Sequence, residues 1–400
     1  MGAQASRVYP IVRALVAAGH KVAVVTGMPN YPTGIVLQQY RGKHFIREDR
    51  DGFTVLRTAY YTTARNRSRW AQLFSYLSFI PAAFHSGLRA GPIDLVFVTS
   101  PPIFSVLPAI WLSRLRRAKL VVDVRDLWPD EMIACGATSK GSLSERLITA
   151  IERCSYRAAD CVCCTTQSFV ETVVARGTEV AKVLLIPNGA DLTLFRVLPV
   201  CKDIVGKYSL GDRFVVLYSG VLGIKHGLEV IEEAANILSN KKDIVFLIVG
   251  GGARHEPLRQ RAMKMGLHNM IFAGQQKIED VPALIARADI CLSALLPEPY
   301  FGKIITVKVF EYMACERPVV AAVAGETARV LNESGAGIVV APGDAYAMSE
   351  AICQLYADPE RRLAMGKRGR RYVEQNYSRA TWAVHLETAL SNLVRHNFVM

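Results

Sequence analysis

Apolar residues along this chain fall into two recurring patterns. Short continuous runs rich in Val, Ile and Leu predict buried strands of a parallel sheet, and the longer segments between them have the period of crossover helices. In the first half, strands are expected over 21–26, 53–57, 94–99, 120–124, 160–165 and 183–187, and helices over 4–18, 68–89, 104–116, 142–159 and 168–176.

The same alternation starts again after the segment Asn188-Gly189-Ala190-Asp191. Here strands are expected over 214–219, 244–249, 270–273, 290–294, 319–322 and 337–340. Two series of alternating elements predict an α/β chain with two Rossmann-like, doubly wound domains. We place the first domain at residues 1–195 and the second at 196–378. We expect residues 379–400 to form a helix that packs back towards the first domain.

The first predicted element is a helix, whereas a doubly wound domain ordinarily begins with a strand. In the usual strand order that first strand is central. Burying its five or six apolar residues at about 1.5–3 kcal/mol each rivals the stability of a whole domain, about 5–15 kcal/mol. We therefore expect that the first strand of this domain is missing and that Met1 is a late start. A naturally shorter sheet with another edge is the alternative.

Composition and charge narrow the choice of function. With 51% apolar and 21% charged residues, the chain is not expected to be disordered. Its formal net charge is +13, and residues 1–120 hold 16 Lys and Arg against 4 Asp and Glu. This excess favours anionic lipids, nucleic acid or phosphorylated substrates as partners of the first domain. We do not expect nucleic acid, because no recognised binding module accompanies the basic residues.

The most basic segment, residues 65–69, precedes Trp70 and an apolar stretch, and together they predict a basic amphipathic helix. Contact with an anionic membrane surface is one interpretation, and a plain helix that buries its apolar side is the other. A second basic helix end follows Trp111, at residues 114–119. No segment predicts a transmembrane helix or a secretory signal. We expect a cytoplasmic protein, peripheral on the inner face of the cytoplasmic membrane.

Two segments could suggest a metal site, but both have simpler explanations. The cluster Cys161-Val162-Cys163-Cys164 lacks the spacing of metal ligands, so we interpret its cysteines as core residues. The segment Asp49-Arg50-Asp51 has the spacing of a chelating motif, but the glycine that follows favours a hairpin turn. We expect no obligatory metal and no other cofactor.

Two glycine clusters follow strands of the second domain. Gly220 and Gly223 precede Lys225 and a helix, so backbone amides, a helix amino terminus and a lysine could all approach one anion. Gly250 and Gly251 end the next strand at the same edge, because parallel strands put their carboxyl ends together. A tight turn that needs glycine is the alternative for the first cluster.

Lys308 and Glu311 lie three residues apart, on one face of a predicted helix that Lys303 precedes. A carboxylate can accept from both hydroxyls of a ribose, and a lysine can bind a diphosphate, so the pair suits a nucleotide sugar. A surface ion pair is the alternative. We take Lys225, Lys303 and Lys308 as candidate diphosphate partners, Lys308 also as a catalytic candidate, and Glu311 as the ribose ligand.

In the first domain, charged residues follow a strand that we expect to be buried, where open α/β sheets hold ligands. A solvated loop is the alternative. We assign Arg125 and Asp126 to catalysis, at the acceptor or the transferred sugar. Asp123 and Trp128 flank them, and Ser100 offers a hydroxyl to the same site from the preceding strand.

The chain resembles the family-four retaining glycosyltransferases of GT-B fold over essentially its whole length. The resemblance is carried by the first glycine cluster, Phe310-Glu311-Tyr312-Met313-Ala314 and Ile186-Pro187-Asn188-Gly189-Ala190-Asp191. Three further segments resemble the branch that builds bacterial O-antigen and capsule, including N-acetyl-fucosamine transferases: residues 2–8, 26–34 and 123–129. In that branch a strand normally precedes Gly2, which agrees with the missing-strand prediction. We expect Gly2, Ser6, Asn30, Tyr31, Ser100, Asp123 and Trp128 on the acceptor side.

Two departures from the family pattern affect the site. The wider family has a Glu eight positions before the residue that matches Glu311, where this chain has Lys303. Its cleft histidine is replaced by Arg125-Asp126. Contacts to the donor sugar therefore cannot be carried over from the wider family.

The resemblance implies a transferase that moves a sugar from a nucleotide donor, UDP-linked, with retention of configuration. The sugar is expected to be an N-acetylated hexosamine or deoxyhexosamine, and the acceptor a polyprenyl-diphosphate-linked saccharide or a polysaccharide. Two alternatives remain open. One is a nucleotide-sugar epimerase or hydrolase of the same fold. The other is a truncated, non-catalytic protein that binds nucleotide sugars or membranes.

Overall fold

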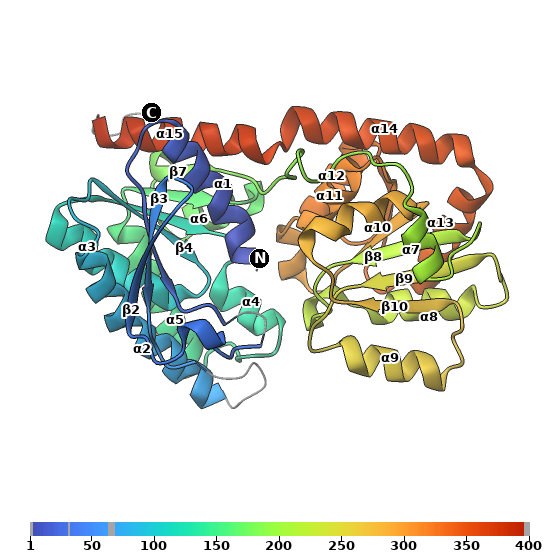
Figure 1. Cartoon of the computed structure of the whole chain (residues 1–400), viewed down its shortest axis with the longest axis horizontal. Coiled ribbons are helices and arrows are strands. Elements are labelled where there is room, and N and C mark those ends of the chain that lie inside the picture. Colours follow the sequence, from blue (N-terminus) through green and yellow to red (C-terminus); the bar gives the residue numbers. More distant parts are fainter. Residues whose placement is uncertain (1–2, 31–32, 63–68, 396–400) are drawn as a thin grey trace. The chain divides into compact units, whose positions relative to one another are not determined.

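The computed structural model describes residues 3–30, 33–62 and 69–395, except for the side chains of residues 3–6 and 69. The chain forms two compact units (Figure 1). Unit 1 comprises Met1–Pro187 and Ala380–Met400, and unit 2 comprises Asn188–Arg379. The chain therefore passes from one unit to the other twice.

Seven strands of unit 1 form two sheets within the described ranges. The first has the order β1-β3-β2, with β2 antiparallel to β3, and the second has four parallel strands in the order β4-β5-β6-β7. The strands are β1 (Ala23–Gly27), β2 (Phe45–Arg50), β3 (Phe53–Thr58), β4 (Leu95–Ser100), β5 (Lys119–Val124), β6 (Cys161–Cys164) and β7 (Val183–Leu185).

The helices of unit 1 pack against these sheets. Two helices from opposite ends of the chain, α1 and α15, share one apolar cluster, in which Ile11 packs with Leu386 and Leu390. Val121 and Cys163 from the four-stranded sheet belong to the same cluster. The helices are α1 (Ala3–Ala17), α2 (Arg69–Leu88), α3 (Val106–Arg116), α4 (Trp128–Ala134), α5 (Leu143–Ala158), α6 (Gln167–Ala175) and α15 (Arg379–Arg395).

The division of unit 1 into two sheets differs from the single doubly wound sheet that the sequence predicts. In the described chain, β1 and β4 each pair with a strand on one side only. The hairpin prediction is confirmed, because Arg50 pairs with Phe53 and a two-residue turn joins β2 to β3. Asp51 and Gly52 in this turn both have positive φ, 51° and 85°, as the tight hairpin turn requires.

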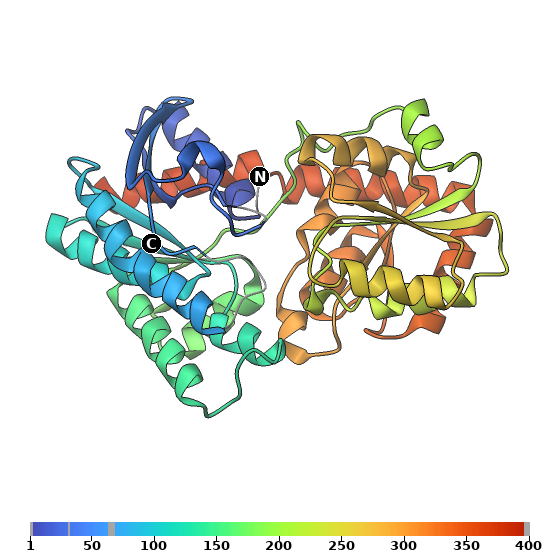
Figure 2. The same cartoon turned by 60° about the horizontal axis from the view of Figure 1, so that its bottom comes forward.

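Unit 2 has one six-stranded parallel sheet in the order β10-β9-β8-β11-β12-β13, with helices on its two faces (Figure 2). Every residue of β8, β9, β11 and β12 is buried, as expected for a sheet covered on both sides. The strands are β8 (Phe214–Ser219), β9 (Ile244–Val249), β10 (Met270–Gly274), β11 (Ile290–Ala294), β12 (Val319–Ala322) and β13 (Gly337–Val340). The helices are α7 (Lys202–Lys207), α8 (Glu229–Ile237), α9 (His255–Lys264), α10 (Val281–Arg287), α11 (Val307–Ala314), α12 (Gly325–Ser334), α13 (Ala345–Ala357) and α14 (Pro359–Asn376).

The sheet of unit 2 reverses its strand order between β8 and β11. Open α/β sheets hold their ligands at the carboxyl ends of the strands at such a reversal. The segments that follow β8 and β11 contain most of the residues that the sequence assigns to the donor. None of the helices in the described ranges combines the length and the apolar character that crossing a bilayer requires.

Candidate functional site

The glycine turns after β8 and β9 lie directly against each other. A Cβ atom added to Gly250 would lie 1.9 Å from the carbonyl oxygen of Gly220, and both glycines have positive φ, 139° and 144°. A Cβ atom on Gly252 would lie 2.5 Å from the carbonyl oxygen of Leu222. Only glycine fits such a backbone contact. Gly223 lacks this constraint, because its φ is −115° and its nearest neighbour would lie 3.6 Å away.

Lys308 places its ammonium group beneath the first of these turns. A Cβ atom on Gly220 would lie 3.2 Å from Nζ of Lys308. The lysine side chain is 8% exposed, and Nζ lies 3.8 Å from the centre of the Tyr218 ring. Within the described chain, Nζ has no hydrogen-bond partner. A buried ammonium group without a partner is costly unless a ligand completes its surroundings.

The surroundings of Lys308 lower its affinity for a proton. Burial lowers the pKa of Lys308 to about 7, against an opposing effect of Glu311, and Lys225 lowers it further. His226 is buried beside them, and burial together with both lysines holds the pKa of this histidine well below its usual value. His226 is therefore neutral at pH 7, and the positive charge at this turn comes from Lys225 and from Lys308 in its protonated form.

Glu311 lies one turn along α11 from Lys308 and is partly buried. Burial raises the pKa of Glu311, and the charges of Arg379 and Lys308 oppose that rise. Helix α11 is held at the end of β8 by Tyr312, whose hydroxyl donates to the carbonyl of Ser219 at 3.0 Å and accepts from its N–H at 2.7 Å. This double contact fixes the face of α11 that carries the lysine and the glutamate.

Lys225 lies on the connection from β8 to α8, and Lys303 lies on the connection from β11 to α11. Lys225 lies in the short 3-10 helix η4 (Ile224–His226), close enough to Lys308 and His226 to affect their pKa values. Lys303 ends the 3-10 helix η6 (Pro299–Lys303), on the connection from β11 to α11. Both are partly exposed at the carboxyl edge of the sheet.

In unit 1, the predicted site residue Asp123 is a partner in a buried ion pair. Asp123 is 0% exposed at the end of β5. Arg7 of α1 donates to its two carboxylate oxygens at 2.7 and 3.0 Å, and Thr99 donates to it at 3.1 Å. Arg7 also donates to the carbonyl of Ile186 at 3.0 Å. This network joins α1, β4, β5 and the end of β7.

Two other predicted residues of unit 1 have polar atoms without partners in the described chain. Arg125 is partly exposed and donates to the carbonyl of Pro101 at 3.0 Å, but its Nε has no partner. Burial lowers the pKa of Arg125. The hydroxyl of Ser100 is buried and has no partner either. Asp126 follows Arg125 at the same strand end.

The remaining acceptor-side predictions have different outcomes. Trp128 begins α4 and packs edge-on against Phe104, with ring centres 5.8 Å apart. Asn30 donates to the hydroxyl of Tyr60 at 3.1 Å. Gly2, Tyr31 and the side chain of Ser6 lie outside the described residues.

The described residues include no candidate metal site. They contain no group of three His, Cys, Asp or Glu side chains placed to hold one ion. The absence of a metal requirement stays a prediction.

Sequence comparisons match the two units separately. The family described as "Glycosyl transferase 4-like domain" matches residues 2–189, and "Glycosyl transferases group 1" matches residues 213–358. WcaI of Escherichia coli K12, assigned as a colanic acid biosynthesis glycosyl transferase, is 30% identical over 70% of this chain and 70% of its own length. The chain belongs to the family-4 glycosyltransferases.

Solved structures support the same fold for this glycosyltransferase. Sucrose-phosphate synthase of Thermosynechococcus elongatus superposes with a TM-score of 0.77 at 22% identity, covering 98% of this chain and 94% of that structure. HepE of Anabaena in complex with UDP-glucose superposes with a TM-score of 0.69 at 17% identity, covering 92% and 99%. The prediction of two Rossmann-like units in a GT-B glycosyltransferase is confirmed.

In this glycosyltransferase, five predicted donor residues lie together at the strand reversal of unit 2: Gly220, Lys225, Gly250, Lys308 and Glu311. Gly251 lies in the same turn, where an added Cβ would lie 3.2 Å from Gln275. Sequence reasoning did not assign Arg7 to the site. The sequence feature that could have indicated a buried role for Arg7 is its position on the apolar face of a predicted helix.

Proposed function

We propose that this glycosyltransferase transfers a sugar from a UDP-linked donor to a lipid-linked or polysaccharide acceptor in the assembly of a surface polysaccharide. The observation that carries the proposal is the buried, unpartnered ammonium of Lys308 beneath the glycine turn. The complex of HepE with UDP-glucose and the assignment of WcaI to colanic acid biosynthesis support it. We propose an N-acetylated hexosamine or deoxyhexosamine as the sugar, and transfer with retention and without an obligatory metal.

The proposed donor site stabilises the leaving group. Negative charge accumulates on the diphosphate as the glycosidic bond breaks, and fixed positive groups stabilise it where it forms. Lys308 and Lys225 provide that charge, and the amides of the glycine turn add hydrogen bonds. At about 4 Å and an effective dielectric constant of about 20, each lysine attracts a unit negative charge by roughly 4 kcal/mol before the cost of desolvation.

Glu311 binds the ribose in this proposal. Its carboxylate accepts from the two hydroxyls of the ribose, and α11 sets the distance between ribose and diphosphate because it also carries Lys308. On the acceptor side, we propose that Arg125 and Asp126 contact the acceptor or the transferred sugar. The free Nε of Arg125 and the free hydroxyl of Ser100 are the polar atoms that an acceptor would satisfy.

The affinity for UDP is expected to fall as the pH rises from 7 to 9. Lys308 has a pKa of about 7 in the empty protein, and a bound diphosphate stabilises its protonated form, so binding above pH 7 takes up a proton. The dissociation constant should therefore rise by up to about ten-fold per pH unit. Isothermal titration calorimetry in buffers of different ionisation enthalpy measures both the affinity and the proton uptake.

Lys308→Arg is the control for this pH dependence, because a guanidinium stays charged throughout the range. The variant should bind UDP with little change between pH 7 and 9. If wild type and variant lose affinity with the same slope, another group causes the dependence.

A donor screen tests the proposed reaction. Purified protein is incubated with UDP- and GDP-sugars and a membrane lipid extract, and labelled sugar in the lipid fraction is measured. We expect UDP-N-acetyl sugars to be transferred. Glu311→Ala should weaken UDP binding about 10- to 100-fold, because charge-assisted hydrogen bonds to the ribose are lost. Glu360→Ala, on the exposed first turn of α14, is the matched control and should bind like wild type.

Other outcomes of the screen distinguish the alternatives. A UDP-sugar that is epimerised or hydrolysed without an acceptor would identify the enzyme of the same fold instead of a transferase. Full transfer by Glu311→Ala would refute the ribose assignment. Binding of GDP in preference to UDP would refute the choice of nucleotide.

A further inference from the structure

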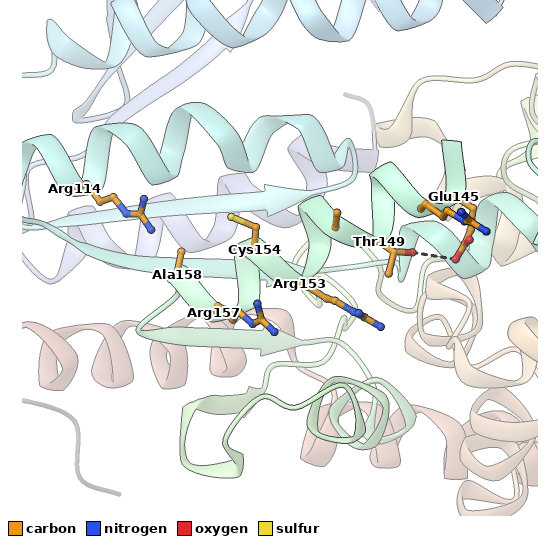
Figure 3. Close-up of a pocket in the computed structure, with 9 residues that line it drawn as sticks. Arg114, Glu145, Thr149, Arg153, Cys154, Arg157 and Ala158 are labelled. Carbon is orange, nitrogen blue, oxygen red and sulfur yellow. Dashed lines mark hydrogen bonds between the residues drawn. The ribbon is translucent and has the colours of Figure 1, made fainter. Parts of the chain in front are cut away.

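A basic groove of about 680 Å³ lies on unit 1 between α3 and α5, apart from the strand ends described above (Figure 3). Four arginines line it: Arg114 from α3, and Arg146, Arg153 and Arg157 from α5. Figure 3 shows Arg153 and Arg157 projecting from α5 beside the groove. Glu145 is the single carboxylate in the lining. The groove therefore carries a clear excess of positive charge.

These four arginines are not neutralised within the described part of the chain. No ion pair there involves Arg114, Arg146, Arg153 or Arg157, and all four are exposed. The hydroxyl of Thr149 donates to Glu145. Four exposed, unneutralised guanidinium groups in one groove have the chemistry that suits phosphate groups, which arginine binds in a two-pronged geometry.

Exposed apolar side chains lie on the same two helices, α3 and α5, outside the lining of the groove. Leu143 and Leu147 lie one turn apart on α5 and are 83% and 55% exposed. On α3, Trp111 and Leu115 are 48% and 62% exposed. A free phosphate ion would leave this apolar surface in water, whereas the interface of a bilayer accommodates apolar side chains below a layer of phosphates.

We propose that the α3–α5 face of unit 1 docks on an anionic phospholipid bilayer, with the four arginines at the headgroup phosphates and Leu143, Leu147, Trp111 and Leu115 in the interface. Arg116 and Arg117, at the end of α3, add two further positive charges to this face. The role of this surface rests on the proposed function, because a lipid-linked acceptor is presented at the membrane. The surface differs from the exposed start of α2, for which membrane contact is one of two interpretations of the sequence.

Flotation of the full chain with vesicles tests the proposal. Vesicles of phosphatidylglycerol and phosphatidylethanolamine should carry the protein at low salt, and pure phosphatidylcholine vesicles should not. Each arginine at an anionic surface raises the partition coefficient roughly five-fold. The triple variant R146Q/R153Q/R157Q should therefore lower it about 100-fold. L143S/L147S should lower it as well, and this loss should persist in high salt, where the charge contribution is screened.

A matched triple variant separates a local site from net charge. Lys241, Lys242 and Lys264 are exposed on unit 2, and K241Q/K242Q/K264Q removes the same charge elsewhere. This control should float like wild type. UDP binding should be the same in all variants, so that a failure of flotation is distinguishable from a failure of the proposed donor site.

Several results would overturn the proposal. These are equal losses in the two triple variants, flotation lost only on substitution of Trp70 and Phe74 of α2, and equal capture by phosphatidylcholine. A wild-type protein that does not float would also overturn it. So would a concentration-dependent dimer that L143S/L147S abolishes, because a second copy of the chain would then cover this face.

Discussion

Lys308→Met is expected to lower kcat/KM for sugar transfer about 100- to 1,000-fold, the usual effect of removing one group that stabilises developing negative charge. Methionine approximates the length of the lysine stem and can remain against the ring of Tyr218, so the loss is one of charge. The free energy of unfolding should stay the same or increase, because a buried ammonium without a hydrogen-bond partner is removed. Steady-state kinetics and thermal unfolding of the same preparation measure both effects.

Lys277→Met provides the matched control. Lys277 is exposed in unit 2, on the connection from β10 to α10, and its substitution should leave turnover unchanged. A Lys308→Met enzyme with near-normal kcat/KM would contradict the assignment of this lysine to the leaving group. An enzyme that loses activity together with its unfolding transition would instead indicate a structural part for Lys308.

Asp123→Ala is expected to destabilise the protein by about 3–5 kcal/mol. The substitution leaves Arg7, 8% exposed, without its carboxylate in the interior of unit 1, and an uncompensated buried charge has a cost of this size. A domain of this size should then unfold about 10 °C lower, at roughly 2–4 °C per kcal/mol. Differential scanning calorimetry can resolve the transition.

Two further variants make the interpretation of Asp123→Ala specific. Combining it with Arg7→Met should cost less than the sum of the two single substitutions, because the unpaired charge is then absent. Glu179→Ala breaks the exposed pair with Lys182 and should cost less than about 1 kcal/mol. If Asp123→Ala keeps its stability and loses only transfer, Asp123 contacts the acceptor directly, as the sequence predicts.

The pattern of apolar residues along the chain is sufficient to predict most of the helices and strands. Each predicted strand lies within two residues of its predicted bounds, because a parallel sheet covered on both faces needs continuous apolar runs. The unpredicted strand β2 has the sequence FIREDR, with four charged residues and no buried position. It pairs with β3 at one side only, so its side chains need no apolar pattern.

The grouping of the candidate donor residues was easier to predict than the hydrogen-bond network of unit 1, because it depends on local spacing. Lys308 and Glu311 lie on one helix turn, and the glycines lie at strand ends, so local spacing places them together. Arg7 and Asp123 are separated by 116 residues and meet only when α1 packs on the end of β5. No local sequence pattern links residues so far apart. The sequence therefore predicts Asp123 as a site residue but does not predict its ion pair with Arg7.

The division of unit 1 into two sheets was not predicted either. Apolar runs indicate which segments form strands, but they do not indicate which edges pair. β1 and β4 both have runs typical of interior strands, yet each pairs on one side only within the described chain. The sequence prediction of a missing central strand concerns this same region of the unit and stays a prediction.

The two segments that connect the units determine how the protein can be divided. Ala190 donates to the carbonyl of Tyr377, and Arg379 donates to that of Ala190, each at 3.0 Å, so the segments are held together at one point. Unit 2 lies between them as one uninterrupted stretch, whereas unit 1 needs α15 from beyond Arg379 to complete its core. A gene fragment for residues 188–379 can therefore be excised for separate expression. A fragment ending at Pro187 would lack α15 and would expose apolar surface of Ile11 and Val121 to water. A fragment of unit 1 in which α15 is joined ahead of α1 would bury that surface again.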